Sequence, residues 1–91
     1  MNSRTTEKFR IKFEELPAEI KNLAKKSFTL WKENPYHKSL RFKQVHQNKP
    51  IYSVRIGKAW RALGVKEDET VIWFWVGSHS EYDKMIKVLN N

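Results

Sequence analysis

Hydrophobic residues recur along the chain at two spacings, which predict where strands and helices lie. Over residues 9–13 apolar and basic residues alternate, which predicts a strand with one apolar face. The polar residues 1–6 before it are expected to fray. From Pro17 onward the apolar positions lie three or four apart, which is typical of an amphipathic helix. This helix should end near Asn34, because Pro35 restricts the residue before it.

The second half of the chain predicts a series of strands followed by a helix. The expected strands are residues 40–46, 51–56, 60–65 and 71–76. The last strand is almost continuously apolar, so it should lie centrally in the sheet, covered on both faces. Within it, Trp73 and Trp75 alternate and are expected to share a face. Residues 80–89 repeat their apolar positions at helical spacing. This order predicts an α+β fold with the helices packed on one face of the sheet.

Length and composition narrow the class of protein. With 91 residues the chain is expected to form one domain, residues 1–91. It has no cysteine, which excludes a disulfide framework and a thiolate metal site. No apolar leader and no apolar run of membrane-spanning length is visible. We therefore expect a cytoplasmic protein.

Charge is distributed unevenly along the chain. The formal net charge is +8, and residues 34–66 contain no Asp or Glu but eight Lys and Arg. Ordinary surfaces mix both signs, so a long acid-free segment favours a site for a polyanion, most simply RNA. An anionic membrane surface or an acidic protein would also satisfy the charge, which by itself does not choose between them.

Two groups of residues carry candidate chemistry. Arg55 and Arg61 lie symmetrically about Lys58, so a hairpin centred there would place them side by side, as a pair suited to a phosphate. His79 follows the last strand at the start of the final helix, where it could transfer protons near neutral pH. A histidine at a helix start is more often structural, and arginines often only cover neighbouring aromatic rings. The three histidines lack the spacing of metal ligands, so neither a metal nor another cofactor is expected.

Three segments together resemble the RelE/ParE toxin superfamily of bacterial type II toxin–antitoxin systems. They read LPAEIKNLAKKSFTLWKENPYHKSLRFKQV, YSVRIGKAWRALGV and IWFWVGSHSEYDKMI, and the resemblance extends from about Phe9 to Leu89. It implies a small twisted antiparallel sheet with an N-terminal helix and a short C-terminal helix packed on it. It also implies a cognate antitoxin as partner, together with either cleavage of mRNA, often on the ribosome, or inhibition of DNA gyrase without any cleavage.

The resemblance assigns roles to individual residues. Arg55 matches a basic position used on the RNA backbone, and Arg61 matches the arginine used on the scissile phosphate. His79 matches a position held by a catalytic arginine or, in YafQ-like members, a histidine. Tyr82 falls near an aromatic residue that stacks on a base. The chain departs from many members in having Trp60 where they have tyrosine, and in continuing through a C-terminal helix.

The resulting hypothesis is a metal-independent ribonuclease in which the 2′-hydroxyl attacks the adjacent phosphate. Arginines would stabilise the developing charge and His79 would act as general acid. Glu81 is a possible general base and His46 a weaker candidate. Residues expected to grip RNA are Lys21, Lys25, Lys43 and Lys58. A gyrase-inhibiting toxin and a plain nucleic-acid-binding module remain the alternatives.

Overall fold

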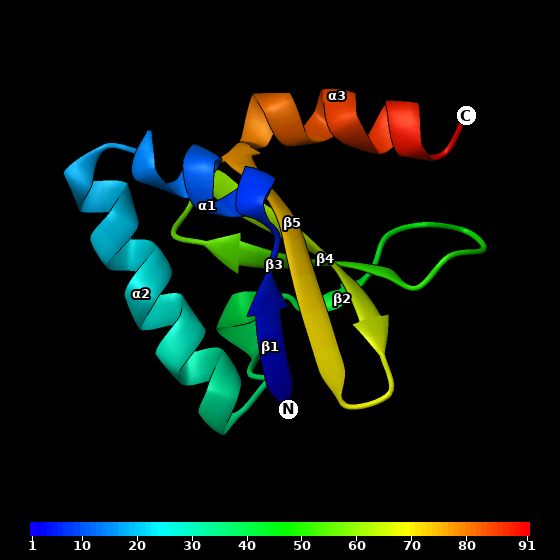
Figure 1. Ribbon diagram of the computed structural model, residues 1–91, viewed down its shortest axis with the longest axis horizontal. Helices are drawn as coiled ribbons and strands as arrows, with labels where there is room; N and C mark the ends of the chain where they lie inside the picture. The colour runs from blue at the N-terminus through cyan, green and yellow to red at the C-terminus, as the bar shows by residue number, and fades with distance from the viewer.

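A five-stranded sheet with three α-helices makes up the computed structural model, which describes residues 1–91 (Figure 1). The elements in chain order are β1 (Asn2–Thr5), α1 (Glu7–Glu14), α2 (Ala18–Glu33), a short 3₁₀ helix η1 (Lys38–Leu40), β2 (Lys43–Gln44), β3 (Ile51–Ile56), β4 (Trp60–Glu67), β5 (Thr70–Ser78) and α3 (His79–Leu89). The α+β class predicted from the sequence is confirmed. None of the helices is both long and apolar enough to cross a membrane.

The strands are arranged in the order β1-β5-β4-β3-β2. Strands β2 to β5 follow one another as antiparallel neighbours, as predicted, whereas β1 pairs in parallel with β5. The prediction that residues 1–6 fray is therefore wrong for Asn2–Thr5. Parallel neighbours cannot be joined by a tight turn, and here the chain between β1 and β5 runs through α1, α2 and strands β2 to β4. β5, expected at the centre, is internal, but the middle strand is β4.

The predicted strand at residues 9–13 is wrong, because this segment belongs to α1. The Thr6 hydroxyl accepts a hydrogen bond from the Phe9 amide at 3.1 Å and caps the helix. One turn apart, the rings of Phe9 and Phe13 stack at 6.2 Å on the face toward the core, while Ile11 is 56% exposed. A segment of only five residues is compatible with the two-residue repeat of a strand and with the 3.6-residue repeat of a helix. In this protein the helix forms, and it packs both aromatic rings against the core.

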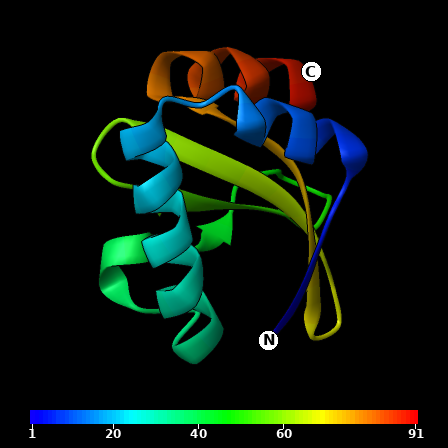
Figure 2. The ribbon, with the colours of Figure 1, turned by 60° about the vertical axis from the view of Figure 1, so that its left-hand side comes forward.

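Helices cover both faces of the sheet, not one as predicted. On one face, α1 and α2 pack with Ala24 and Trp31 over a cluster that includes Val54 and Trp73. Figure 2 shows α2 crossing in front of this face. On the other face, α3 packs over a smaller cluster of Ile51, Leu63 and Trp75. The second face is therefore the one on which β3, β4 and α3 can bring side chains together.

An irregularity in the β4–β5 pairing decides where the tryptophans point. The register shifts between Leu63 and Gly64, whose partners are Trp75 and Trp73, so that Phe74 has no partner of its own. An extra residue of this kind reverses the alternation of side chains beyond it. Trp73 and Trp75 consequently belong to clusters on opposite faces, which corrects the expectation that they share one. Both are buried.

The predicted strand at residues 40–46 is reduced to the two residues of β2. Before it, Arg41 has the left-handed backbone angle φ of 47°, which interrupts an extended conformation directly after η1. Leu40 and Phe42 are nevertheless buried in the core cluster under α2. The segment thus contributes to the core mainly through these two side chains and little through strand pairing.

Candidate nucleic-acid interface and active site

The β3–β4 hairpin sets Arg55 opposite Arg61. Gly57 supplies the positive φ of 60° that the tight turn needs, and the two arginines are register partners, as the sequence predicted. Both lie on the face that α3 partly covers. Arg55 is four residues from Ile51 and Arg61 is two residues from Leu63, and even spacings along a strand place side chains on the same face. The Arg55 Nε donates to the Gly57 carbonyl at 2.8 Å, which holds its guanidinium near the turn.

The guanidinium of Arg61 lies in a partly closed environment. Its Cζ lies 5.3 Å from the centre of the Tyr82 ring, a distance typical of a cation–π contact. Solvent does not reach its Nε and Nη1, and no hydrogen-bond acceptor of the protein contacts them. The neighbouring β-strand position is Gly77, which adds no side chain. Buried donors without a partner destabilise the free protein, and because Arg61 is only half-buried its positive charge can still attract an anion to this face.

The first turn of α3 is fixed by a capping box. The Ser78 hydroxyl accepts from the Glu81 amide at 3.3 Å, and the Ser78 amide donates to Glu81 Oε1 at 3.1 Å. These bonds from the Ser78 backbone and side chain lower the pKa of Glu81, and Lys12 and Lys84 add to the effect. The side chain proposed as a general base is thus engaged in holding the helix start.

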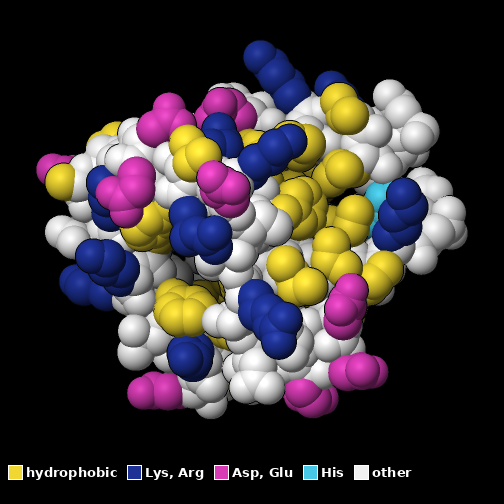
Figure 3. All heavy atoms as spheres, in the orientation of Figure 1, with side chains coloured by type: hydrophobic (Ala, Val, Ile, Leu, Met, Phe, Trp, Pro, Cys, Tyr) yellow, Lys and Arg dark blue, Asp and Glu magenta, His cyan; other side chains and the backbone are white.

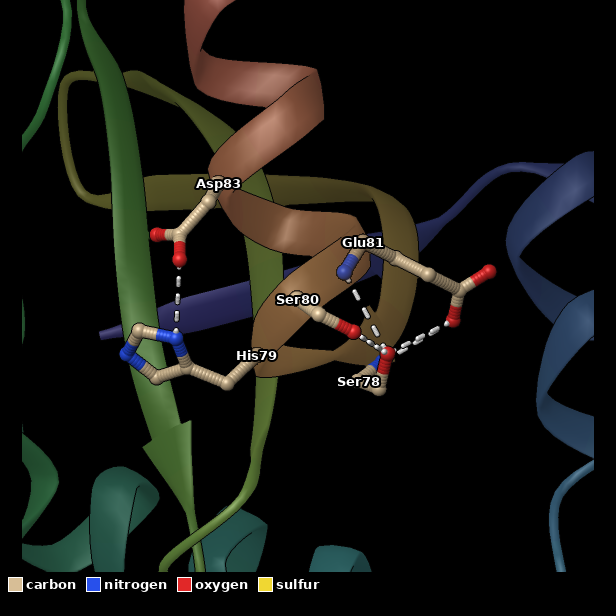
Figure 4. Close-up of polar contacts among 5 residues, drawn as sticks. All are labelled: Ser78, His79, Ser80, Glu81 and Asp83. Atoms are coloured by element: carbon tan, nitrogen blue, oxygen red, sulfur yellow. Dashed lines mark hydrogen bonds and ion pairs between the residues drawn. The ribbon is translucent and has the colours of Figure 1, made fainter.

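His79 points away from Glu81 and toward Asp83. Figure 4 shows the imidazole and the Asp83 carboxylate facing one another, while the Glu81 carboxylate lies on the other side of the helix. The distance from His79 Nδ1 to Asp83 Oδ2 is 3.3 Å. The His79 ring also meets the Tyr82 ring edge-on at 5.8 Å, so His79 and Arg61 contact the same aromatic ring.

Asp83 was missed in the sequence. Residues 79 and 83 are one helical turn apart, a spacing that places two side chains on the same helix face. The signal was therefore present once residues 80–89 had been predicted as a helix. Glu81, the carboxylate predicted as a general base, is only two residues from His79 and faces elsewhere.

The four predicted RNA-gripping lysines are not gathered in one place. Lys43 pairs with Ser53 in β2–β3 and so shares the face of Arg55. Lys58 is exposed in the hairpin turn between the two arginines. By contrast, Lys21 and Lys25 belong to α2, which packs on the opposite face, and Lys21 forms an ion pair with Glu14 at 3.2 Å.

His46, the weaker candidate base, has both ring nitrogens engaged. Its Nδ1 accepts from the amides of Asn48 and Lys49 at 3.0 and 2.9 Å. Its Nε2 lies 2.8 Å from the Leu89 carbonyl, to which it donates. The ring therefore ties the β2–β3 loop to the end of α3, away from the hairpin turn that holds the arginines.

A cavity of about 320 Å³ lies on the opposite face, between α1, α2 and the sheet. It is visible in Figure 3 as a hollow beside α2 with hydrophobic side chains at its floor. Of the residues predicted for the site, only Lys25 lines it. The cavity is thus apolar and separate from the arginine pair. Nowhere do three or more His, Asp or Glu side chains gather as metal ligands would.

Comparisons with known proteins agree on the family and the fold. A family model described as a ParE-like toxin domain matches residues 19–84. The RelE toxin of the RelB–RelE complex from Methanococcus jannaschii is 19% identical, with a TM-score of 0.66 over 89% of this chain and 96% of that one. The isolated E. coli RelE toxin is 16% identical, with a TM-score of 0.65 over 96% of both chains. E. coli YafQ is 12% identical, with a TM-score of 0.65 over 89% and 96%. No curated protein sequence matches the chain. At these identities the structural matches establish a shared fold.

Proposed function

Since the chain belongs to the family of ParE-like toxin domains, we propose that it is the toxin of a type II toxin–antitoxin system and cleaves mRNA. The proposed reaction is a metal-independent endonucleolytic cleavage. The fold of the chain matches those of RelE and YafQ. The proposal that it cleaves RNA rests on this chain's own side chains.

The observation that carries the proposal is the position of Arg61. Two of its guanidinium nitrogens are desolvated and unpaired, and its cross-strand neighbour is a second arginine. Two neighbouring arginines, neither of them fully buried, attract an anion such as a phosphate. His79 contacts the same Tyr82 ring, so the phosphate site and a group able to transfer protons lie together.

The chemistry follows from these positions. The ribose 2′-oxygen attacks the adjacent phosphorus, a bond to the 5′-oxygen breaks, and a 2′,3′-cyclic phosphate remains. Arg61, assisted by Arg55, stabilises the charge that develops on the phosphate oxygens. His79 gives a proton to the leaving 5′-oxygen through Nε2. The nucleophile is part of the substrate, so the reaction asks the protein mainly to orient the backbone and to move protons.

In the proposed step the proton of the 2′-hydroxyl passes to solvent water. His46 has both ring nitrogens in hydrogen bonds, Nδ1 within the β2–β3 loop and Nε2 to the Leu89 carbonyl of α3. Glu81 holds the capping box through Oε1 and faces away from His79, and its lowered pKa makes it a weak base. Neither residue is therefore assigned as the general base. Tyr82 supports Arg61 and His79, and because Arg61 lies over one face of its ring, that face is not open to a nucleobase.

The proposed partners follow from the family and the charge. The structures similar to this chain include RelE toxins held with RelB antitoxins, and we propose an antitoxin partner here as well. A net charge of +8 favours an acidic antitoxin and a ribosomal or mRNA target in the cytoplasm. Lys43 and Lys58 extend the arginine site along the RNA, while Lys21 and Lys25 offer a second basic contact on α2.

The decisive experiment replaces His79 and Arg61 separately with alanine and maps mRNA 5′ ends after induced expression. Both variants should fold and lose cleavage, and cuts in frame with codons in the wild type would indicate cleavage on the ribosome. Circular dichroism and thermal unfolding serve as the folding control. Normal cleavage rates in both variants would refute the assignment.

A gyrase-inhibiting toxin is the second candidate, favoured by the ParE-like description of the matching family model. Such a toxin acts on a protein and needs no proton donor beside the arginines. Expression of the His79→Ala variant separates the two candidates: growth arrest that persists without new mRNA 5′ ends would support gyrase inhibition.

A further inference from the structure

The only carboxylate that faces the His79 ring is that of Asp83. Both residues belong to the first turns of α3, and the His79 Nδ1 lies 3.3 Å from Asp83 Oδ2 (Figure 4). The backbone of His79 is itself fixed, because its amide donates to the Ala59 carbonyl at 2.7 Å. The ring is therefore held at three points: by its backbone, by the Asp83 carboxylate and by the edge of Tyr82.

This contact has a consequence for the protons of the ring. A carboxylate only accepts hydrogen bonds, so a carboxylate 3.3 Å from Nδ1 favours the form of the ring that carries a hydrogen on Nδ1. In the neutral ring the other nitrogen, Nε2, is then without a hydrogen, and in the charged ring Nε2 holds the proton that can be given away. The side chains of His79 and Asp83 are 47% and 60% exposed, which leaves Nε2 accessible to a substrate.

We infer that Asp83 is a positioning residue for His79, which fixes the imidazole tautomer and directs Nε2 toward the scissile phosphate. The inference rests on the proposed ribonuclease function. In the proposed step the charged ring loses its Nε2 proton to the 5′-oxygen as the bond from phosphorus to that oxygen breaks. The ring becomes neutral and keeps its Nδ1 hydrogen on Asp83, so no rotation or proton exchange is needed within the step.

A merely structural contact would behave differently. An exposed ion pair one turn apart on a helix contributes little to stability, and if its role were only structural its loss would leave the cleavage rate unchanged. A positioning contact instead changes the tautomer of one histidine and the rate of the chemical step. It does not hold the RNA, because the carboxylate of Asp83 repels phosphate, so loss of Asp83 should not weaken RNA binding.

The test combines NMR with single-turnover kinetics on the full chain. Two-bond ¹H–¹⁵N spectra of the side chains would report the tautomer of His79, with its signals assigned by their loss in His79→Gln. Asp83→Ala should shift the neutral ring of His79 toward the Nε2–H form. The same variant should cleave a synthetic mRNA on ribosomes about 10- to 100-fold more slowly, with the KM for that mRNA changed less than twofold.

Two further variants sharpen the result. Asp83→Glu keeps a carboxylate within reach on the same helix face and should recover most of the rate and the wild-type tautomer. Asp68→Asn removes the same charge in the β4–β5 turn and should change neither, because Asp68 lies outside the site.

Each outcome decides the inference. An unchanged His79 tautomer in Asp83→Ala overturns it, and so does an altered tautomer with a wild-type cleavage rate. A wild-type protein that cleaves no RNA overturns the proposed function and the catalytic part of the inference together. Even then, the NMR spectra show whether Asp83 sets the tautomer, so the two failures can be told apart.

Discussion

Replacing Arg61 with methionine should make the protein more stable and less active. The change removes the charge and the two desolvated donors, Nε and Nη1, that have no hydrogen-bond acceptor. Methionine has a similar length and an apolar chain that can pack on the Tyr82 ring, so the site should stay filled. A residue kept at the expense of stability is what a phosphate-binding role predicts.

The magnitude follows from the contacts of the guanidinium. Each buried donor without a partner costs about 1–3 kcal/mol. The cation–π contact with Tyr82, at 5.3 Å, stabilises the wild-type fold by roughly 0.5–1 kcal/mol, which methionine would lose. For two such donors the net gain for Arg61→Met is therefore about 1–5 kcal/mol, which in a domain of this size raises Tm by at least about 4 °C. Loss of a group that stabilises charge in the transition state should lower the cleavage rate by about 10²–10³-fold.

Urea unfolding followed by tryptophan fluorescence measures the first effect, and cleavage of ribosome-bound mRNA measures the second. Arg55→Met is the matched control, since its Nε donates to the Gly57 carbonyl and the variant should lose about 0.5–1.5 kcal/mol. The reasoning is refuted if Arg61→Met unfolds at the same urea concentration as the wild type, or at a lower one.

Three further predictions concern the framework of the site. Gly64→Ala should lower the free energy of unfolding by about 1–3 kcal/mol, since its new Cβ would lie 2.5 Å from Val71 Cγ1; a wild-type melting temperature would contradict this. His46→Ala should lose about 1–3 kcal/mol in urea unfolding through its three hydrogen bonds and yet cleave mRNA at the wild-type rate. Glu81→Gln keeps an acceptor but loses the charge whose pKa is lowered by Ser78, so it should be less stable by about 0.3–1 kcal/mol at pH 7. Because a lowered pKa stabilises the fold only while the carboxylate is charged, this difference should shrink as the pH falls below the ordinary glutamate pKa of about 4.3 and disappear below the lowered pKa of Glu81.

The sequence correctly predicted those elements that are specified by residues close together in the chain. The long helix α2 follows from its apolar stripe and from the prolines that bracket it. The register of Arg55 with Arg61 follows from a turn at Gly57, because a tight turn fixes the pairing of the strands beside it. In each case the interacting residues are within a few positions of one another, so the sequence alone could specify the geometry.

Where two local readings were possible, contacts with the sheet chose between them. Residues 9–13 alternate like a strand, but as part of α1 they bring Phe9 and Phe13 onto the same core cluster. The polar segment Asn2–Thr5 has no strand pattern and becomes β1 because β5 offers it an unpaired edge. The bulge opposite Leu63 and Gly64 then separates two tryptophans that strict alternation would have kept together.

Some parts of the candidate site follow from local sequence, and others depend on tertiary packing. The sequence by itself placed the two arginines together and put His79 at the start of a helix, because hairpin and helix geometry are local. It also contained the one-turn spacing of His79 and Asp83. Only the tertiary structure decided that α3 crosses the second face of the sheet, so that Tyr82 reaches Arg61 from 21 positions away in the sequence. That contact depends on how apolar side chains of α3 pack on β4 and β5, and packing between distant segments is not written in any local pattern.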